Sequence, residues 1–413
     1  MLSVAEARAR VIAGLRPTAT EVVALSEAWG RVTAMPLQAR LTQPPTDVSA
    51  MDGYALRAED GAVGAWLRVA GRAPAGHPFM GRVGAGEAVR LYTGSAVPDG
   101  ADCVVVQEDV TVDDARDGAG DDARGGAGIT LLAAARPGRH IRRKGGDFAQ
   151  GTHLVPAGTR LGARAVGLAA AGNHPWVSVH RRPRIALLAT GDEIALPGDP
   201  LGPGGIVSSN VHALAALVRA GGGEPMMLPI ARDTVGAVAQ AIQGVAGLDM
   251  LVTTGGASVG DYDLVQAGLA QHGFTLDFWR IAMRPGKPLL SGTLHGLPVL
   301  GLPGNPVSAL VCAVLFLWPA LSKLSGLPGA ALPSVQMPLG TDAAVNDHRE
   351  DYLRAAIAPG TDGVDRVTPF PVQDSSMSRL LAEAQGLVIR PPNAPALRAG
   401  SHVPVLRLDT LGL

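Results

Sequence analysis

The chain has 413 residues, which is enough for two to four domains of roughly 100–200 residues each. Hydrophobic residues make up 47% of it, which excludes global disorder. A net charge of -1 and an aromatic content of only 4% disfavour nucleic-acid binding, so we expect any anionic ligand to be held locally.

The N-terminal part of the chain is predicted to be helical at first and then rich in β-strands. Residues 1–40 are predicted to be helical, starting at a capping box from Ser3 to Glu6. The first residues carry charges throughout and lack the continuous apolar region of a signal peptide. Short β-type runs broken by proline and glycine dominate residues 41–145, which we assign to a β-rich lobe. Within it, the near-perfect duplication at 113–128 is interpreted as a solvated loop.

A helical segment of small residues follows the lobe. It lies around "ARAVGLAAAG", so we group residues 146–180 with 1–40 as an N-terminal helical or linker domain. The two cysteines of the chain, Cys103 and Cys312, are too few for a disulfide framework or a thiolate metal site. They fit a reducing, cytoplasmic location.

Residues 181–326 alternate apolar strand-like runs with helical patterns. This alternation predicts an α/β domain whose mostly parallel sheet is covered by helices on both faces. The run "RIALLA" precedes the helix "NVHALAALVRA", for which we predict Asn210 as the cap and Gly221 as the stop. The longest apolar run ends at Pro319, well short of the ~18 residues of a membrane span, so we predict a buried helix and no membrane contact.

β-like segments return in residues 327–413, which predicts a small C-terminal β domain. The expected fold class is therefore a multidomain α/β plus β protein, with a central three-layer α/β/α domain and an N-terminal helical and β lobe.

Four loops of the α/β domain carry polar residues where parallel strands end. They are "TGDE" (190–193), the loop ending at Asp233, "GGASVGDYD" (255–263) and "LPGNP" (302–306). Ligands of open parallel sheets bind beyond the carboxyl ends of the strands, so these loops are expected to form one site. Each has a plainer explanation: Asp233 or the aspartates of 255–263 could cap helices, and Arg284 or Lys287 could be solvated surface charges.

The chemistry that fits these loops together is the binding of a phosphate with a divalent ion. Backbone amides of glycine-rich turns bind phosphate, while Mg²⁺ prefers one or two carboxylates plus phosphate oxygens. The stretch "RIAMRPGKP" adds Arg280, Arg284 and Lys287 to neutralise anionic charge. The chain has no Walker A pattern, no GxGxxG fingerprint and no histidines at zinc spacing, so kinase, dehydrogenase and zinc-enzyme functions are disfavoured.

Three further stretches lie outside the α/β domain. "TDVSAMDGYAL" (46–56) contains Asp52, whose Asp-Gly pair could also be a simple hairpin turn. "LYTG" places Thr93 on a turn, and "RRKGGDF" places Asp147 after a basic run that could be a solvated loop.

With these motifs assembled, the chain resembles the MoeA family of molybdopterin molybdenumtransferases and the matching part of gephyrin-type proteins. The motifs "SAMDGYA", "TGDE", "GGASVGDYD", "RPGKP" and "LPGNPVSA" carry the resemblance in order, and it runs nearly from end to end. It implies a MogA-like α/β domain and a reaction in which adenylylated molybdopterin and molybdate give molybdenum cofactor and AMP, with Mg²⁺ assisting. It also implies an elongated homodimer whose cleft lies between the α/β domain of one subunit and the β lobe of the other.

The resemblance assigns roles to residues motif by motif. Glu193, Asp233 and Asp263 would hold the metal, and the hypothesis is that Mg²⁺ there polarises the pyrophosphate linkage while Arg284 and Lys287 stabilise the departing AMP. The expected catalytic residues are Asp52, Asp147, Glu193, Asp233 and Asp263. The expected substrate-binding residues are Thr93, Gly255, Gly256, Ser258, Arg280, Arg284, Lys287, Pro303, Asn305, Pro306, Arg349 and Ser375.

The sequence departs from the family pattern at two places. Gly146 stands where the family frequently has glutamate, and Arg280 and Arg284 stand where lysines are often found, which keeps the charge but changes its geometry. The resemblance further implies a molybdopterin adenylyltransferase and molybdoenzymes or their chaperones as partners. Two alternative functions remain open: a non-catalytic pterin-binding scaffold and a molybdopterin adenylyltransferase.

Overall fold

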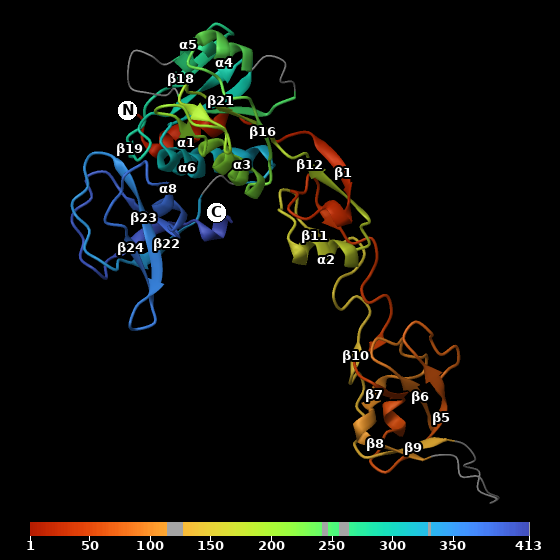
Figure 1. The fold of residues 1–413 in the computed structure, drawn as a ribbon. Coiled ribbons are helices and arrows are strands. Elements are labelled where there is room, and N and C mark those ends of the chain that lie inside the picture. The colour runs from red at the N-terminus through yellow and green to blue at the C-terminus, as the bar shows by residue number, and fades with distance from the viewer. Residues whose placement is uncertain (114–126, 242–246, 256–263, 329–331, 413) are drawn as a thin grey trace, which may run out of the picture. The chain divides into compact units, whose positions relative to one another are not determined.

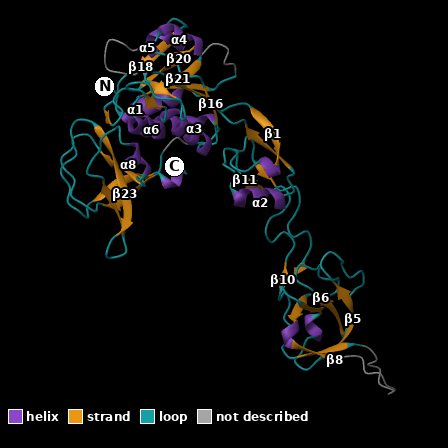
Figure 2. Cartoon of the chain, viewed as in Figure 1, coloured by secondary structure: helices purple, strands orange, loops and turns teal. Residues whose placement is uncertain are grey.

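The computed structural model describes residues 1–113, 127–241, 247–255, 264–328 and 332–412 (Figures 1 and 2). Residues 114–126 of the predicted loop and residues 256–263 of "GGASVGDYD" therefore lie outside the described residues. The chain divides into two compact units. Unit 1 comprises residues 1–35, 157–162 and 177–413, and unit 2 comprises residues 36–156 and 163–176. The bounds of our four predicted domains stay a prediction.

A six-stranded sheet forms the centre of unit 1. In spatial order it contains β16 (Glu224–Met227), β13 (Arg184–Ala189), β17 (Met250–Thr254), β21 (Leu297–Leu302), β20 (Leu290–Leu294) and β18 (Phe274–Phe278). The first four of these strands run parallel to one another. β20 is antiparallel to both β21 and β18, so β18 again runs in the direction of the parallel strands.

Helices cover both faces of this sheet because alternate strand residues point to opposite faces. Ile185 and Leu187 of β13 pack in one core cluster, whereas Ala186 and Leu188 pack in another. Figure 1 shows α1, α3 and α6 together on one side of the sheet and α4 and α5 on the other. The predicted three-layer α/β/α arrangement is thereby confirmed. The first face carries α1 (Val4–Ala13), α3 (Asn210–Ala220), α6 (Pro306–Cys312) and α7 (Trp318–Leu324), and the second carries α4 (Val235–Ala241) and α5 (Leu264–Ala270).

The helix after "LPGN" is longer than predicted. It runs from Pro306 to Leu324 and includes a π-helical turn, η4 (Ala313–Leu317), so it continues beyond Pro319, where the apolar run ends. The prediction of a buried helix is confirmed. Proline lacks the amide donor of a regular helix, and the wider π turn directly before it accommodates that loss. The helix has 19 residues and a mean hydropathy of 1.9, but 83% of it is buried inside the protein, as in a core helix.

The C-terminal part of unit 1 is a small antiparallel β domain, as predicted. An isolated bridge between Leu339 and Val367 brings the segment after the first strand of the domain next to its third strand, which gives the sheet a barrel-like closure. The domain contains β22 (Ser334–Pro338), β23 (Glu350–Pro359), β24 (Asp365–Pro369), β25 (Gly386–Arg390), β26 (His402–Arg407) and the short helix α8 (Ser378–Ala382).

The backbone of one residue, Ala282, links three distant segments of unit 1. The short strand β19 (Met283–Arg284), from the α/β part of the chain, pairs in parallel with β23 and joins the sheet of the β domain. Beside it, Ala282 N–H donates to Leu2 O at 2.8 Å, and Glu350 N–H donates to Ala282 O at 2.9 Å.

Unit 2 is built on a second six-stranded sheet. Its β4 and β6 are antiparallel neighbours in which Tyr54 faces Arg90. In spatial order the sheet contains β7 (Cys103–Val106), β4 (Gly53–Leu56), β6 (Glu87–Leu91), β5 (Trp66–Ala73), β9 (Gly128–Leu131) and β8 (Val110–Asp113). Smaller elements are β2 (Leu37–Gln38) with β11 (His153–Val155), β3 (Val48–Ser49) with β10 (Ile141–Arg142), and α2 (Ala163–Ala171), the predicted small-residue helix.

Two predictions near the N-terminus and at Asp52 are wrong. The capping box of Ser3 and Glu6 is confirmed, but the helix ends at Ala13 and β-branched residues beyond Pro17 form a strand instead. Asp52-Gly53 is not a hairpin turn, since β3 pairs with β10 whereas β4 pairs with β6 and β7.

The remaining elements are β1 (Thr20–Ala24) with β12 (Trp176–His180), β14 (Ile194–Ala195) with β15 (Ile206–Val207), and the 3₁₀ turns η1 (Leu25–Glu27), η2 (Ala58–Asp60), η3 (Gln107–Asp109) and η5 (Asp409–Leu411).

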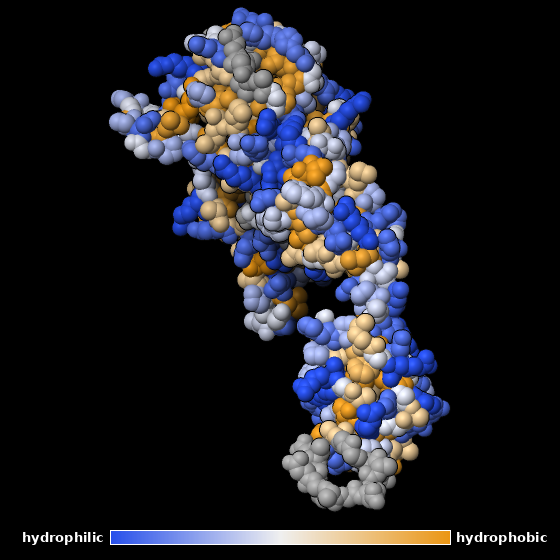
Figure 3. Space-filling model, turned by 90° about the vertical axis from the view of Figure 1, so that its right-hand side faces the viewer, coloured by the Kyte–Doolittle hydropathy of each residue, from blue (hydrophilic) through white to orange (hydrophobic). Residues whose placement is uncertain are grey.

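The surface is chemically mixed. Figure 3 shows hydrophilic and hydrophobic residues interspersed over the visible face. Single exposed hydrophobic side chains, such as Trp29 at 71% and Met80 at 92% exposure, are ordinary for a folded protein.

Candidate active site

The polar loops predicted from the sequence meet at one edge of the sheet of unit 1, which we call the ligand edge. The parallel strands β16, β13, β17 and β21 end there, and so does β18, because it runs in the same direction. Arg280 follows β18, and Lys287 precedes β20, whose amino end lies at the same edge. The backbones of these two segments meet where Ile281 N–H donates to Lys287 O at 3.1 Å.

A polar pocket of about 460 Å³ opens at the ligand edge. Among its described lining residues Glu193 is the only charged one, while hydroxyl and amide groups supply most of the other polar atoms. The pocket lies where β13, β17 and β21 end and where α3 and α6 begin. Its polar lining residues are Thr190, Glu193, Ser208, Ser209, Asn210, Thr254, Asn305 and Ser376, and Gly255, Gly304 and Pro306 complete the loops around them.

Asn210 ties these loops together. Its Nδ2 donates to Thr254 Oγ1 at 2.9 Å and to Gly304 O at 2.7 Å, and Thr254 Oγ1 in turn donates to Pro303 O at 3.1 Å. The prediction that Asn210 caps α3 is wrong, because Ser209 occupies the cap position and the amide of Asn210 turns to the strand ends instead. Asn210 was therefore missed as a site residue, although its place at the start of a helix is visible in the sequence.

Gly255 is required by the close approach of two loops. Its φ of +94° lies in the left-handed region, and a Cβ atom on it would stand 2.3 Å from Thr190 O. Thr190 Oγ1 is buried and has no hydrogen-bond partner among the described residues. Three predicted site residues of the same loop, Gly256, Ser258 and Asp263, lie outside the described residues.

Three carboxylates gather where β13 and β16 end. Asp233 N–H donates to Asp192 Oδ1 at 3.3 Å. The pKa of Asp233 is raised by burial and by the neighbouring negative charges of Glu193 and Asp192. Thr234 rather than Asp233 caps α4, since Ala237 N–H donates to Thr234 Oγ1 at 3.2 Å. Mutual repulsion of this kind is relieved by a bound cation.

The β domain contributes a loop to the same pocket. Asn305 Nδ2 donates to Ser375 Oγ at 2.9 Å, and Val307 N–H donates to Ser375 O at 3.1 Å. The predicted residues Asn305 and Ser375 are thereby brought together, and Ser376 beside them lines the pocket.

A buried arginine holds that loop in place. Arg354 of β23 is 1% exposed, and its guanidinium donates to Met377 O at 3.3 Å and to Val372 O at 3.5 Å, on either side of the loop. Arg354 was missed because the run "DYLRAAI" is an ordinary strand pattern, in which a single arginine resembles a solvated residue.

Arg284 faces the β domain. Its Nη2 pairs with Asp351, whose side chain is only 5% exposed, and its Nη1 lies 3.4 Å from Asp347 Oδ2. Arg349 Nη2 also binds Asp347 Oδ2, at 2.8 Å, and this bond holds the pKa of Asp347 far below its usual range. The alternative that Arg284 is a solvated surface charge is wrong, since it forms ion pairs in this cluster.

The predicted site residues of unit 2 form a separate group. Asp52 Oδ1 accepts both the N–H and the hydroxyl of Thr93, each at 2.7 Å, and these bonds lower the pKa of Asp52. Arg90 stands beside them, 4.9 Å from the ring centre of Tyr54 and 5.4 Å from that of Tyr92. Asp147 lies on an exposed turn between the basic run and α2.

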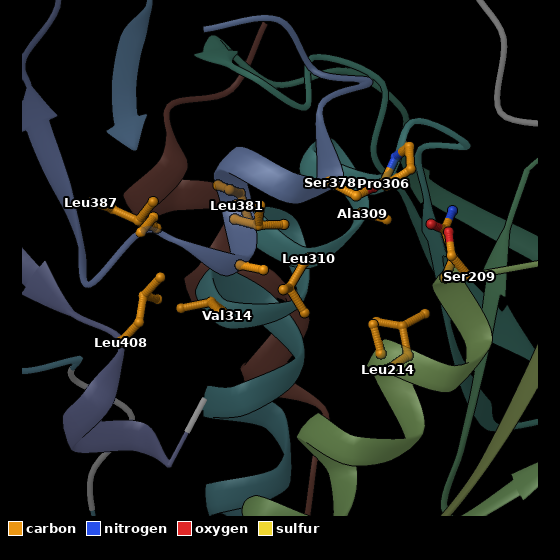
Figure 4. Close-up of a pocket in the computed structure, with 15 residues that line it drawn as sticks. Ser209, Leu214, Pro306, Ala309, Leu310, Val314, Ser378, Leu381, Leu387 and Leu408 are labelled. Carbon is orange, nitrogen blue, oxygen red and sulfur yellow. The ribbon is translucent and has the colours of Figure 1, made fainter. Parts of the chain in front are cut away.

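A second cavity of unit 1 is apolar. It has a volume of about 260 Å³ and shares Ser209, Asn210 and Pro306 with the polar pocket. Figure 4 shows Leu310, Val314, Leu381, Leu387 and Leu408 around it, contributed by the long helix and the β domain. No charged group is among its described lining residues, so the polar pocket is the better candidate for chemistry.

Comparisons with known proteins cover nearly the whole chain. Three family models match in order: the MoeA N-terminal region (domain I and II) at residues 2–172, a probable molybdopterin binding domain at 186–323, and the MoeA C-terminal region (domain IV) at 336–408.

Full-length relatives share this organisation. A molybdopterin molybdenumtransferase of a Nostoc species is 36% identical over 94% of this chain and 89% of its own length. Molybdopterin molybdenumtransferase 2 of Mycobacterium tuberculosis is 35% identical over 98% of this chain and 99% of its own. The crystal structure of a molybdopterin biosynthesis MoeA protein from Pyrococcus horikoshii has a TM-score of 0.80 and 30% identity over 98% of this chain and 99% of that one. With matching models in order and relatives of this identity along their full length, the chain belongs to the MoeA family.

Proposed function

We propose that this protein is a molybdenumtransferase, which inserts molybdate into adenylylated molybdopterin, forms molybdenum cofactor and releases AMP. The observation that carries the proposal is the distribution of charge along the ligand edge. Acids stand where β16 and β13 end, and the cations Arg280 and Lys287 stand beside β18 and β20. Neighbouring strands lie about 4.8 Å apart, so four strand steps from β13 to β18 span roughly 19 Å. An edge of this length suits an extended, nucleotide-linked pterin.

The acidic end of the edge fits Mg²⁺. Glu193 and Asp233 would hold the ion, because Mg²⁺ takes one or two carboxylates and completes its shell with water and phosphate oxygens. The raised pKa of Asp233 supports this assignment, since the surrounding negative charge favours a cation. When bound, the ion supplies Lewis-acid polarisation of the pyrophosphate linkage. The three carboxylates where β13 and β16 end are neighbours but not a complete ligand set, since among the described residues no group of three or more side chains is placed to hold a metal ion.

The remaining groups suit binding and orientation. Hydroxyls and amides of the polar pocket, including Asn305 and Ser376, can hydrogen-bond a neutral pterin ring. Arg280 and Lys287 supply positive charge for molybdate or for phosphate. The dithiolene of the pterin provides the sulfur for molybdenum, so the reaction needs no cysteine ligand from the protein. Cys103 and Cys312, both buried free thiols, agree with that requirement and with a cytoplasmic location.

The decisive experiment is an assay of the purified protein with adenylylated molybdopterin, molybdate and Mg²⁺. We expect AMP release that depends on molybdate and is lost on chelation of Mg²⁺. Tight pterin binding without AMP release would instead indicate a scaffold, and consumption of ATP would indicate an adenylyltransferase. Glu193→Gln should lower the rate by at least about 100-fold if this carboxylate holds the ion at the reacting linkage.

We also propose a homodimer in which Asp52, Thr93 and Asp147 of one copy complete the site of the other. Mixing two inactive variants tests this arrangement. If Asp52→Asn and Glu193→Gln subunits are mixed and re-associated, half of the dimers are mixed and each carries one intact site, so about a quarter of the wild-type activity should return. No recovery in dimers shown to be mixed would contradict a shared site. A molybdopterin adenylyltransferase would supply the substrate, and molybdoenzymes or their chaperones would receive the product.

A further inference from the structure

The guanidinium of Arg280 lies over the indole of the preceding residue, Trp279. Its guanidinium carbon is 4.1 Å from the ring centre of Trp279, which is the geometry of a cation–π contact. Both residues directly follow β18 at the ligand edge.

The indole is itself fixed by the fold. Trp279 is half-buried and packs against the core cluster formed by the sheet with α4 and α5. Its Nε1 and the Nε of Arg280 are buried and have no hydrogen-bond partner among the described residues. Trp279 is therefore a rigid platform, held by apolar packing.

Within the part of the chain that the structure describes, the charge of Arg280 has no acidic partner. No ion pair or side-chain hydrogen bond joins Arg280 to any other residue that the structure describes, whereas Arg284, four residues on, has two acidic partners. A half-buried cation without a counter-charge is unfavourable, unless an anion binds there. Stacking on Trp279 already restricts the rotamers of the long Arg280 side chain. Less conformational entropy is therefore lost when an anion binds.

We infer that Trp279 is a positioning residue, which holds the guanidinium of Arg280 ready for a tetrahedral oxyanion at the β18 end of the ligand edge. This inference rests on the proposed function. Two sources share the oxyanion chemistry, namely molybdate and the phosphate of the nucleotide-linked pterin. A planar cation stacks on an indole better than an ammonium does, so arginine at this position is matched to the tryptophan before it.

Steady-state kinetics with each substrate varied in turn test the inference. Trp279→Leu should raise the KM of one substrate about five- to tenfold and leave kcat within about twofold, because the lost contact acts on the orientation of a binding group. The substrate whose KM rises identifies the oxyanion. Trp279→Phe, which keeps an aromatic face, should restore most of the affinity. Trp29→Leu is the matched control, since Trp29 is 71% exposed and should leave both KM values unchanged.

A double-mutant cycle separates positioning from general structural support. In an Arg280→Ala background, Trp279→Leu should have no further effect on the affected KM, since the group it orients is gone. Circular dichroism and thermal unfolding establish which variants are folded. If Trp279→Leu is not folded, Trp279→Met takes its place, because methionine is a long, adaptable apolar side chain without an aromatic face. Equal KM values in wild type and a folded Trp279→Leu protein, or a fall in kcat alone, would overturn the inference. An inactive wild-type protein would instead overturn the proposed function.

Discussion

Asn210 offers a sharp test of how the ligand edge is held together. The structure gives its side chain two donor bonds, to Thr254 Oγ1 and Gly304 O, and no capping bond within α3. Two substitutions distinguish these roles. Alanine removes both donors, whereas aspartate removes the donors but keeps a side chain that is well suited to the start of a helix.

The magnitude follows from the two bonds. A neutral hydrogen bond contributes about 0.5–1.5 kcal/mol net, so Asn210→Ala should lower the free energy of unfolding by about 1–3 kcal/mol. At about 2–4 °C per kcal/mol, the Tm should fall by roughly 2–12 °C. Asn210→Asp should be less stable still, because a carboxylate oxygen would face the carbonyl of Gly304.

Calorimetric unfolding and the AMP-release assay provide the measurements. The control is His212→Ala, an exposed position on the same helix that should leave the Tm within about 1 °C of the wild type. If Asn210→Asp proved as stable as wild type and more stable than Asn210→Ala, the side chain would be acting as a helix cap and the bonding scheme given above would be wrong.

Three further changes have defined outcomes. Arg284→Ala leaves the carboxylate of Asp351 buried without its partner and should destabilise unit 1 by about 3 kcal/mol in denaturant unfolding, while adding Asp351→Asn should recover much of the loss. The raised pKa of Asp233 contributes stability that is complete below the usual aspartate pKa and lost as pH rises through the folded value. Asp233→Asn should therefore be more stable than wild type at neutral pH by up to about 1 kcal/mol, with the difference shrinking towards pH 4, and less active. The pKa of Asp52 is lowered by the hydroxyl and the backbone N–H of Thr93, and Thr93→Val removes only the hydroxyl, so the variant should raise this pKa part of the way towards the ordinary value in a carboxyl NMR titration. An unchanged pKa would contradict the hydroxyl bond.

Much of the α/β domain could be predicted from sequence because its strands and helices have clear periods. The alternation of "RIALLA", "MLVTT" and "LPVLGL" with amphipathic helices determines the parallel sheet and the common edge where its loops meet. β18 and β20 were not predicted, since their antiparallel pairing depends on long-range partners. The helical prediction for 1–40 failed for a related reason: strands in short two-stranded sheets such as β1 with β12 have no periodicity strong enough to mark them.

The site was predicted where a loop follows a strand and missed where a side chain crosses between elements. Glu193, Asn305 and Gly255 are found by their position after buried strands. Asn210 and Arg354 act through hydrogen bonds to carbonyl groups far away in the sequence, which no local pattern records.

The backbone of Ala282 joins the α/β domain to the β domain by hydrogen bonds, so the two domains are separate in the sequence but not in the structure. A fragment cut after residue 326 would leave β19 without its neighbour, and a fragment beginning there would expose the lateral amides of β23 to unwanted partners. Trimming the first residues would remove the carbonyl of Leu2 from the same junction. Each half expressed by itself should therefore be prone to aggregation. The two halves expressed together should associate through the pairing of β19 with β23.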